Sequence, residues 1–198
     1  MNKLLKISKI NLSYNTDNNL IKVLQDVSLE VDHKDTVSIV GESGSGKTSL
    51  IMLISGLEKA TSGKIQFKEF EISNLNEDQI SEIRRKNIGI VFQSFYLIPN
   101  YTALENVSLT LEINRISNPE QKAKDMLSRF GLGQRLNNLP SQLSGGEQQR
   151  VAIARSIVMK PQLILADEPT GNLDSDCLLY TSDAADEGLG VDLGGRRI

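Results

Sequence analysis

Residues 41–48 combine glycines, hydroxyl side chains and a lysine in a spacing that suits phosphate binding. Their sequence, Gly-Glu-Ser-Gly-Ser-Gly-Lys-Thr, matches the Walker A pattern G-x-x-x-x-G-K-S/T in full. In such a P-loop, backbone N–H groups point at a phosphate chain, Lys47 adds positive charge and Thr48 offers a hydroxyl to Mg²⁺. The alternative is a glycine-rich turn with an incidental lysine. The residues expected to hold the phosphates are Gly41, Ser43, Gly44, Ser45, Gly46, Lys47 and Thr48.

Two adjacent acids, Asp167 and Glu168, follow an apolar stretch at residues 163–166. If that stretch is a buried strand, its carboxyl end lies where parallel α/β sheets bind ligands. Asp167 would then hold Mg²⁺ through water, and Glu168 would polarise a water for in-line attack on phosphorus. Taken alone, these acids have an ordinary alternative, which is a strand end that faces solvent.

A serine and two glycines, Ser144, Gly145 and Gly146, stand before a glutamate in the pattern that caps a helix. The N-terminus of a helix attracts anions, so this segment is a candidate second anion site. The alternative is a well-capped helix that binds nothing.

The hydrophobic pattern predicts the elements that must position these groups. A β-branched strand at 36–40 leads into the glycine loop, and a helix follows it at 50–57. Alternating residues predict that the chain opens with a β region. The other expected elements are strands at 5–8, 27–31, 65–67, 88–92 and 163–166, and helices at 76–86, 118–130 (capped by Asn118) and 144–160.

The overall composition narrows the class of protein. Lys and Arg number 22 against 25 Asp and Glu, which gives a formal net charge of −3 and argues against a nucleic-acid partner or a polybasic membrane surface. No apolar stretch approaches the roughly 18 to 20 residues that span a bilayer. The start has basic residues but no apolar core of a signal peptide, so we expect a cytoplasmic protein. One cysteine, Cys177, excludes an intramolecular disulfide.

Together these motifs resemble the ATP-binding cassette (ABC) ATPases, whose signature Leu-Ser-Gly-Gly-Gln/Glu matches Leu143–Glu147. The resemblance covers residues 1 to about 175. It implies an α/β fold, a P-loop NTPase with an ABC ATPase core, an N-terminal antiparallel β region and an inserted helical subdomain at about 94–158. It also implies ATP and Mg²⁺ as cofactors and ATP hydrolysis as the reaction.

The resemblance further implies a head-to-tail homodimer, in which Ser144, Gly145 and Gly146 contact the γ-phosphate held on the partner's P-loop. Gln93 resembles the Q-loop glutamine, which touches Mg²⁺ or the lytic water. Its alternative is a polar strand end. Other family positions are Tyr14, which would stack on adenine unless it is a plain surface tyrosine, and Asp174, in a loop at 171–174 that reaches across the dimer.

The segments 91–99, 103–107 and 167–174 resemble one subgroup, the lipoprotein-release and macrolide-export ATPases (LolD-, MacB- and YbbA-like). Members drive FtsX-type permeases, so this resemblance implies an ATPase subunit that lies peripherally on the inner face of the plasma membrane. The rival interpretation is a soluble, non-transport ABC protein that acts in DNA repair or translation. Such proteins usually carry coiled-coil or zinc insertions, for which little room exists between Gln93 and Ser144.

Residues 177–198 depart from the family pattern. The blocks 177–187 and 191–198 resemble, in order, the translation of a transposase-type sequencing-library adapter. We therefore expect a nucleotide-binding domain over 1–176, truncated near Asp176 with the C-terminal part of the core missing, and a non-native tail over 177–198. The family's switch histidine after Glu168 is absent, because His33 precedes the P-loop. Impaired ATP hydrolysis is expected, and a chimeric reading frame without activity is the remaining alternative.

Overall fold

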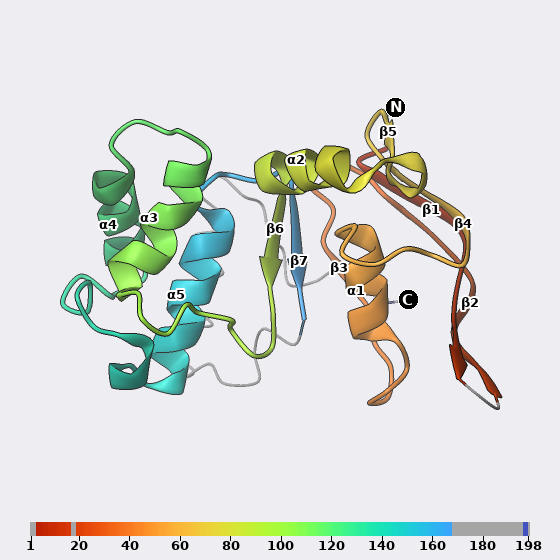
Figure 1. Ribbon diagram of the computed structural model, residues 1–198, viewed down its shortest axis with the longest axis horizontal. Coiled ribbons are helices and arrows are strands. Elements are labelled where there is room, and N and C mark those ends of the chain that lie inside the picture. Colours follow the sequence, from red (N-terminus) through yellow and green to blue (C-terminus); the bar gives the residue numbers. More distant parts are fainter. Residues whose placement is uncertain (1–2, 17–18, 168–195, 198) are drawn as a thin grey trace. The chain divides into compact units, whose positions relative to one another are not determined.

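The computed structural model describes residues 3–16, 19–167 and 196–197. The chain divides into two compact units, and each is described by itself (Figure 1). Unit 1 comprises Met1–Arg84 and Ser182–Ile198, and unit 2 comprises Arg85–Thr181. The helix α2 (Glu77–Asn87) begins in unit 1 and ends in unit 2. Within the described residues, none of the helices has the length and hydrophobicity needed to cross a bilayer.

Unit 1 contains a four-stranded sheet in the order β2-β1-β4-β5, with every neighbouring pair antiparallel. β1 and β2 form a long hairpin, whose register runs from Leu5 opposite Val31 to Thr16 opposite Asn19. The predicted N-terminal antiparallel β region is confirmed, and its strands are longer than predicted. The strand bounds are β1 (Leu5–Thr16), β2 (Asn19–Val31), β4 (Ser62–Phe67) and β5 (Phe70–Glu71).

A bulge in β1 changes which of its side chains face the core. Leu5 and Ile7 are buried before the bulge, and Ile10 and Leu12 are buried after it, so the alternation shifts by one residue. Lys9 lies at this shift with a φ of 50°. The extra residue lets both halves of the strand turn their apolar side chains to the same face.

The rest of unit 1 consists of short elements. α1 (Lys47–Ile54) confirms the helix predicted after the glycine loop. Its buried residues are Leu50, Ile51, Leu53 and Ile54. The strand predicted at 36–40 is wrong in extent, because the ladder with β8 covers only β3 and Val40 is 65% exposed. The remaining bounds are β3 (Val37–Ser38), η1 (Ile72–Asn74) and β8 (Arg196–Arg197).

Unit 2 pairs two parallel strands with a group of helices. Both strands were predicted; the structure pairs them in parallel, aligning Ile88 with Leu163 and Val91 with Ala166, so their carboxyl ends meet at one edge. β7 is only partly covered, since Leu165 alone among its residues is buried. The bounds are β6 (Ile88–Val91), α3 (Ala103–Ile113), α4 (Pro119–Arg129), η2 (Pro140–Gln142), α5 (Gly145–Ile157) and β7 (Leu163–Ala166).

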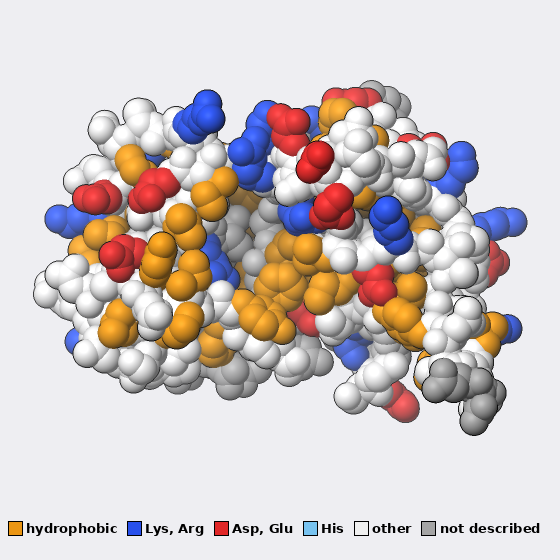
Figure 2. Space-filling view, viewed as in Figure 1, with side chains coloured by type: hydrophobic (Ala, Val, Ile, Leu, Met, Phe, Trp, Pro, Cys, Tyr) orange, Lys and Arg blue, Asp and Glu red, His pale blue; other side chains and the backbone are white. Residues whose placement is uncertain are grey.

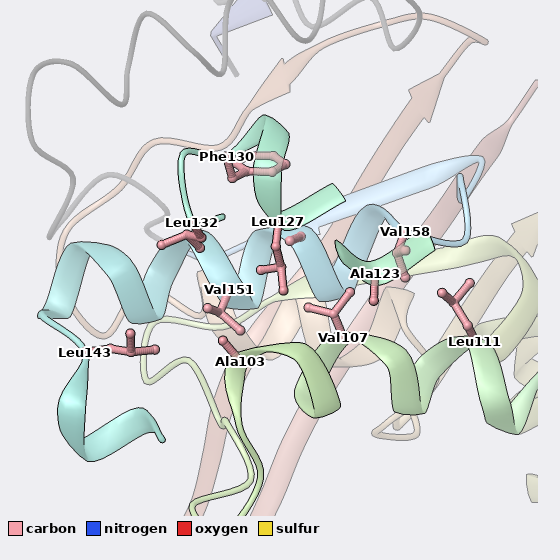
Figure 3. Packing of buried hydrophobic residues seen from close by; sticks show 11 residues of the cluster. Ala103, Val107, Leu111, Ala123, Leu127, Phe130, Leu132, Leu143, Val151 and Val158 are labelled. Carbon is pink, nitrogen blue, oxygen red and sulfur yellow. The ribbon is translucent and has the colours of Figure 1, made fainter. Parts of the chain in front are cut away.

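A hydrophobic cluster holds α3, α4 and α5 together (Figure 3). Val107, Leu127 and Val151 come one from each helix, point toward one another and are fully buried. Burying such a side chain contributes about 1.5–3 kcal/mol, so this cluster is the main support of the helical part of unit 2.

The start of α4 differs from its prediction. Asn118 is the N-cap residue, but its backbone is left-handed (φ 54°, ψ 54°) and its side chain makes no capping hydrogen bond. A capping side chain needs an extended backbone at this position to reach the free N–H groups. Asn118 therefore supplies only the turn, and Pro119 provides the helical φ at the first position.

Candidate functional site

The P-loop of unit 1 is an exposed turn that ends in the N-terminus of α1. Gly44 (φ 81°) and Gly46 (φ 90°) are left-handed, a conformation that glycine adopts at no steric cost. The N–H of Ser45 donates to the Glu42 carbonyl over 3.2 Å, which closes the turn. A Cβ added at Gly44 would meet no atom within 4 Å, so open space borders the loop there.

The side chain of Lys47 forms hydrogen bonds with the backbone of the P-loop. Its Nζ donates to the carbonyl oxygens of Gly41 and Glu42, each over 2.9 Å. The first turn of α1 contains no acidic residue. The lysine charge and the positive end of the helix therefore act together, and this arrangement fits a polyphosphate. Thr48, the second residue of α1, lies at the surface beside them.

In unit 2, Gln93 and Asp167 follow neighbouring strands. Val91 and Ala166 are paired at the ends of β6 and β7, and the N–H of Asp167 donates to the Val91 carbonyl over 2.9 Å. Asp167 is buried, with 7% of its surface exposed. The structure thus brings these two predicted site residues to the same edge of the parallel pair. A carboxylate and an amide oxygen there are suitable ligands for Mg²⁺ or for waters around it.

Glu168 and Asp174 lie outside the described residues, as does the tail predicted at 177–198 apart from the β8 residues. The roles assigned to these two carboxylates stay predictions.

The signature segment forms the predicted cap of α5. The Ser144 side chain accepts from the N–H of Glu147 (3.2 Å), and the Glu147 carboxylate accepts from the N–H of Ser144 (2.8 Å). That carboxylate also accepts from Arg135 Nε over 2.9 Å. These contacts lower the pKa of Glu147, with the Arg135 hydrogen bond as the largest cause.

The glycines of the signature leave the end of α5 accessible. Ser144 and Gly145 are exposed, and a Cβ added at Gly145 would meet no atom within 4 Å. Because Arg135 pairs with the Glu147 carboxylate, the negative charge of that carboxylate is balanced locally. An anion can therefore approach the N-terminus of α5 over Ser144, Gly145 and Gly146.

Tyr14 lies near the turn end of the β1–β2 hairpin, opposite Ile21 of β2, with 42% of its surface exposed. Its hydroxyl donates to Glu58, which follows α1. The predicted site residues thus fall into two groups: Tyr14 and the P-loop in unit 1, and Gln93, Asp167 and the signature in unit 2.

Three residues that support the site in unit 2 were not found from sequence. Asn106 of α3 accepts from the N–H of Ile98 and donates to the Ile98, Tyr101 and Thr102 carbonyls, which holds the loop after Gln93. Gly89 of β6 would place a Cβ 2.4 Å from the Ser156 carbonyl, so it permits close packing of α5. Arg155 binds the same loop from α5. Of these, only the glycine inside a predicted strand was a usable signal.

The sequence matches the ABC transporter family over residues 24–171. It is 43% identical over 175 residues to the lipoprotein-releasing system ATP-binding protein LolD of Idiomarina loihiensis, which covers 87% of this chain and 77% of that protein. It is 46% identical over 156 residues to the uncharacterized ABC transporter ATP-binding protein YbbA of Escherichia coli, covering 78% and 68% of the two chains.

Two solved structures resemble this one. A dimeric bacterial ABC transporter cassette gives a TM-score of 0.86 at 38% sequence identity, covering 92% of this chain and 83% of that one. A dimeric ATP-binding cassette in a post-hydrolysis state, bound to ADP and Pi, gives 0.85 at 37% identity with the same coverage.

Proposed function

Because this chain belongs to the ABC transporter family and is an ATPase of that family, we propose that it powers a membrane transporter of the lipoprotein-release type. The observation that carries the proposal is the conformation of the P-loop. Lys47 Nζ donates to two carbonyl oxygens of the loop, and two glycines of the loop have left-handed backbones. Such a loop binds the β- and γ-phosphates of ATP through N–H groups and the lysine charge.

We also propose that ATP is bound with Mg²⁺, and each unit by itself contains oxygen donors of the kind that this cation prefers. Thr48 offers a hydroxyl oxygen, and Asp167 offers a buried carboxylate at the edge where Gln93 also lies. Oxygen ligands of this kind suit a hard divalent cation. When bound, Mg²⁺ neutralises charge on the phosphates. We assign Gln93 to orienting water at that edge and Glu168 to accepting its proton.

A head-to-tail homodimer gives a role to the second group of residues. Ser144 and Gly145 are exposed at the N-terminus of α5, which suits contact with the γ-phosphate of a nucleotide held by another copy. Both related cassette structures are dimeric, which supports this assembly. Asp174 belongs to the same proposed interface.

The partner and location follow from the relatives. LolD is by name the ATP-binding protein of a lipoprotein-releasing system, so we propose an FtsX-like permease as partner and a peripheral place on the inner face of the plasma membrane. The relatives do not favour a soluble, non-transport ABC protein. We also propose that residues 1–176 form the nucleotide-binding domain, with its helical signature subdomain at about 94–158.

Titration of the full chain with ATP tests the proposal. Lys47→Ala is expected to weaken ATP binding about 10- to 100-fold, the value of losing a hydrogen bond to a charged group. Lys59→Ala removes an exposed lysine of the same unit and should bind as the unaltered chain does. Equal affinities for the two variants would contradict the proposed site.

The transporter assignment has its own test. Co-purification with an FtsX-like permease from membranes is expected. Stable association with ribosomes or DNA instead would favour the non-transport alternative.

A further inference from the structure

One hydrogen bond joins the exposed end of β1 to the segment that follows the P-loop helix. Tyr14 Oη donates to Glu58 Oε1 over 2.5 Å. The residue Tyr14 is 42% exposed and lies beside exposed Leu20 and Ile21, and Figure 2 shows hydrophobic side chains at the surface of this hairpin. The hydrogen bond to Glu58 is the largest cause that raises the pKa of Tyr14. Because of this bond, the ring is oriented although it lies at the surface.

Glu58 is in turn attached to α1. Its backbone N–H donates to the Met52 carbonyl over 3.2 Å, and the N–H of Leu57 donates to the same carbonyl over 2.9 Å. Met52 belongs to the helix whose first residue is Lys47. Two hydrogen bonds and one helix therefore connect the Tyr14 ring to the P-loop.

Further hydrogen bonds fasten β1 to the residues after Glu58. The N–H of Thr61 donates to the Asn11 carbonyl (2.8 Å), and the N–H of Ser13 donates to Thr61 Oγ1 (2.9 Å). These two hydrogen bonds fix the register of β1 against the 58–62 segment. The Glu58 carboxylate is the one contact in this set that fixes the ring itself.

The start of α1 packs against the same hairpin. A Cβ at Gly46 would lie 2.9 Å from Leu24 Cδ2 and 3.1 Å from the Val23 carbonyl, so the loop touches β2 there. Leu24 pairs with Leu12, and Tyr14 lies two residues further along β1. The phosphate loop and the aromatic ring are thus held on one hairpin, a short distance apart along its strands.

We propose that Glu58 is a positioning residue, which holds the Tyr14 ring at a fixed place relative to the P-loop so that the ring selects ligands that carry a base. This inference rests on the proposed function, in which the P-loop binds the phosphates of ATP and Tyr14 stacks on adenine. In this proposal Glu58 acts on the ligand only through its hydrogen bond with the Tyr14 hydroxyl. It should therefore affect recognition of the base and leave recognition of the phosphates unchanged.

Isothermal titration of the full chain with ATP and with inorganic tripolyphosphate separates these contributions. Glu58→Ala is expected to weaken ATP binding about three- to tenfold, since one hydrogen bond to a charged group is lost at an exposed site. Tripolyphosphate binding should not change. Glu58→Gln keeps an acceptor for the hydroxyl and should recover most of the ATP affinity. Glu69→Ala, at an exposed glutamate of the same unit, should behave as the unaltered chain.

Tyr14→Phe provides the variant that keeps the ring and removes only its hydroxyl. It should match Glu58→Ala toward ATP, and the double variant should bind no more weakly than either single one. Equal weakening toward ATP and tripolyphosphate, or unchanged ATP binding in Glu58→Ala, would overturn the inference alone. Failure of the unaltered chain to bind either ligand would overturn the proposed function together with it.

Discussion

Arg155 Nη1 donates to the backbone carbonyl of Tyr96 over 2.7 Å, which fastens α5 to the loop that follows Gln93. Nη2 of the same side chain donates to the Phe95 carbonyl, also over 2.7 Å. Phe95 (φ 56°) and Tyr96 (φ 46°) are both left-handed, a conformation that is costly for aromatic residues. Burial lowers the pKa of the Arg155 guanidinium. The planar guanidinium thus binds the carbonyl oxygens of two successive residues whose backbones are left-handed.

Removal of this side chain should destabilise unit 2. Arg155→Ala leaves two carbonyls without their donor, and a loss of about 2 kcal/mol in the free energy of unfolding is expected from urea titration. Arg155→Lys should recover only part of it, because an ammonium cannot reproduce the two-pronged geometry. Arg129→Ala, at an exposed arginine of α4, is the control. Equal unfolding midpoints for Arg155→Ala and Arg129→Ala would contradict the role given to Arg155.

Alanine substitutions at Gly46 and Gly44 provide a matched comparison of steric crowding in the P-loop. Both glycines are left-handed, so alanine at either should cost about 1–2 kcal/mol of stability. A Cβ at Gly46 would also press on the Val23 backbone, whereas one at Gly44 meets nothing within 4 Å. Gly46→Ala is therefore expected to lower the melting temperature further than Gly44→Ala does. Scanning calorimetry of the two variants makes this comparison, and a larger loss in Gly44→Ala would contradict it.

The motifs predicted more of this molecule than the strand alternation did. The P-loop, the capping box at Ser144 and the two strands that precede Gln93 and Asp167 depend on local pattern, and the structure has them in place. The bulge at Lys9 and the short β3 depend on which partners a strand finds across the sheet. Alternation within one strand carries no information on those partners.

Side-chain hydrogen bonds between segments far apart in the chain were also not predictable from the sequence. The Tyr14 hydroxyl donates to Glu58 in the segment between α1 and β4, and Arg155 donates to the Tyr96 carbonyl, with no local sequence signature for either contact. Asn118 shows the reverse case. Its residue type suits a capping side chain, but the left-handed backbone of the connection prevents that hydrogen bond.

Glu147 predicts how the stability of unit 2 depends on pH. Its pKa is lowered by Arg135 and by the Ser144 N–H, so its contribution is fully present above its ordinary pKa of 4.5 and is lost as the pH falls through the lowered value. The stability gap between the unaltered chain and Glu147→Gln should therefore narrow below pH 4.5. Glu120→Gln, at an exposed glutamate in the first turn of α4, is the control. A gap that is constant from pH 7 to pH 3 in urea titrations would contradict this assignment.

Two apolar residues of α3 test the importance of the hydrophobic cluster. Leu111 is 2% exposed and Ile113 is 53% exposed. Leu111→Ala should cost about 2–5 kcal/mol because it removes buried contacts and leaves a cavity. Ile113→Ala should change stability by less than about 0.5 kcal/mol. Similar effects of the two substitutions on the urea midpoint would show that α3 is not anchored by this cluster.

The proposed role of Asp167 as a ligand of Mg²⁺ predicts how nucleotide binding responds to the metal. Its carboxylate is buried beside the end of β6, and a carboxylate oxygen there is a suitable ligand for Mg²⁺ or for a water around it. Asp167→Asn keeps the size of the side chain and removes its charge. The Mg²⁺ concentration needed for half-maximal ATP binding should rise about 10- to 100-fold in this variant, while binding in EDTA stays as in the unaltered chain. Asp125→Asn, at an exposed position of α4, should change neither quantity. If Asp167→Asn weakens binding equally with and without Mg²⁺, Asp167 supports the fold of the strand ends and does not hold the metal.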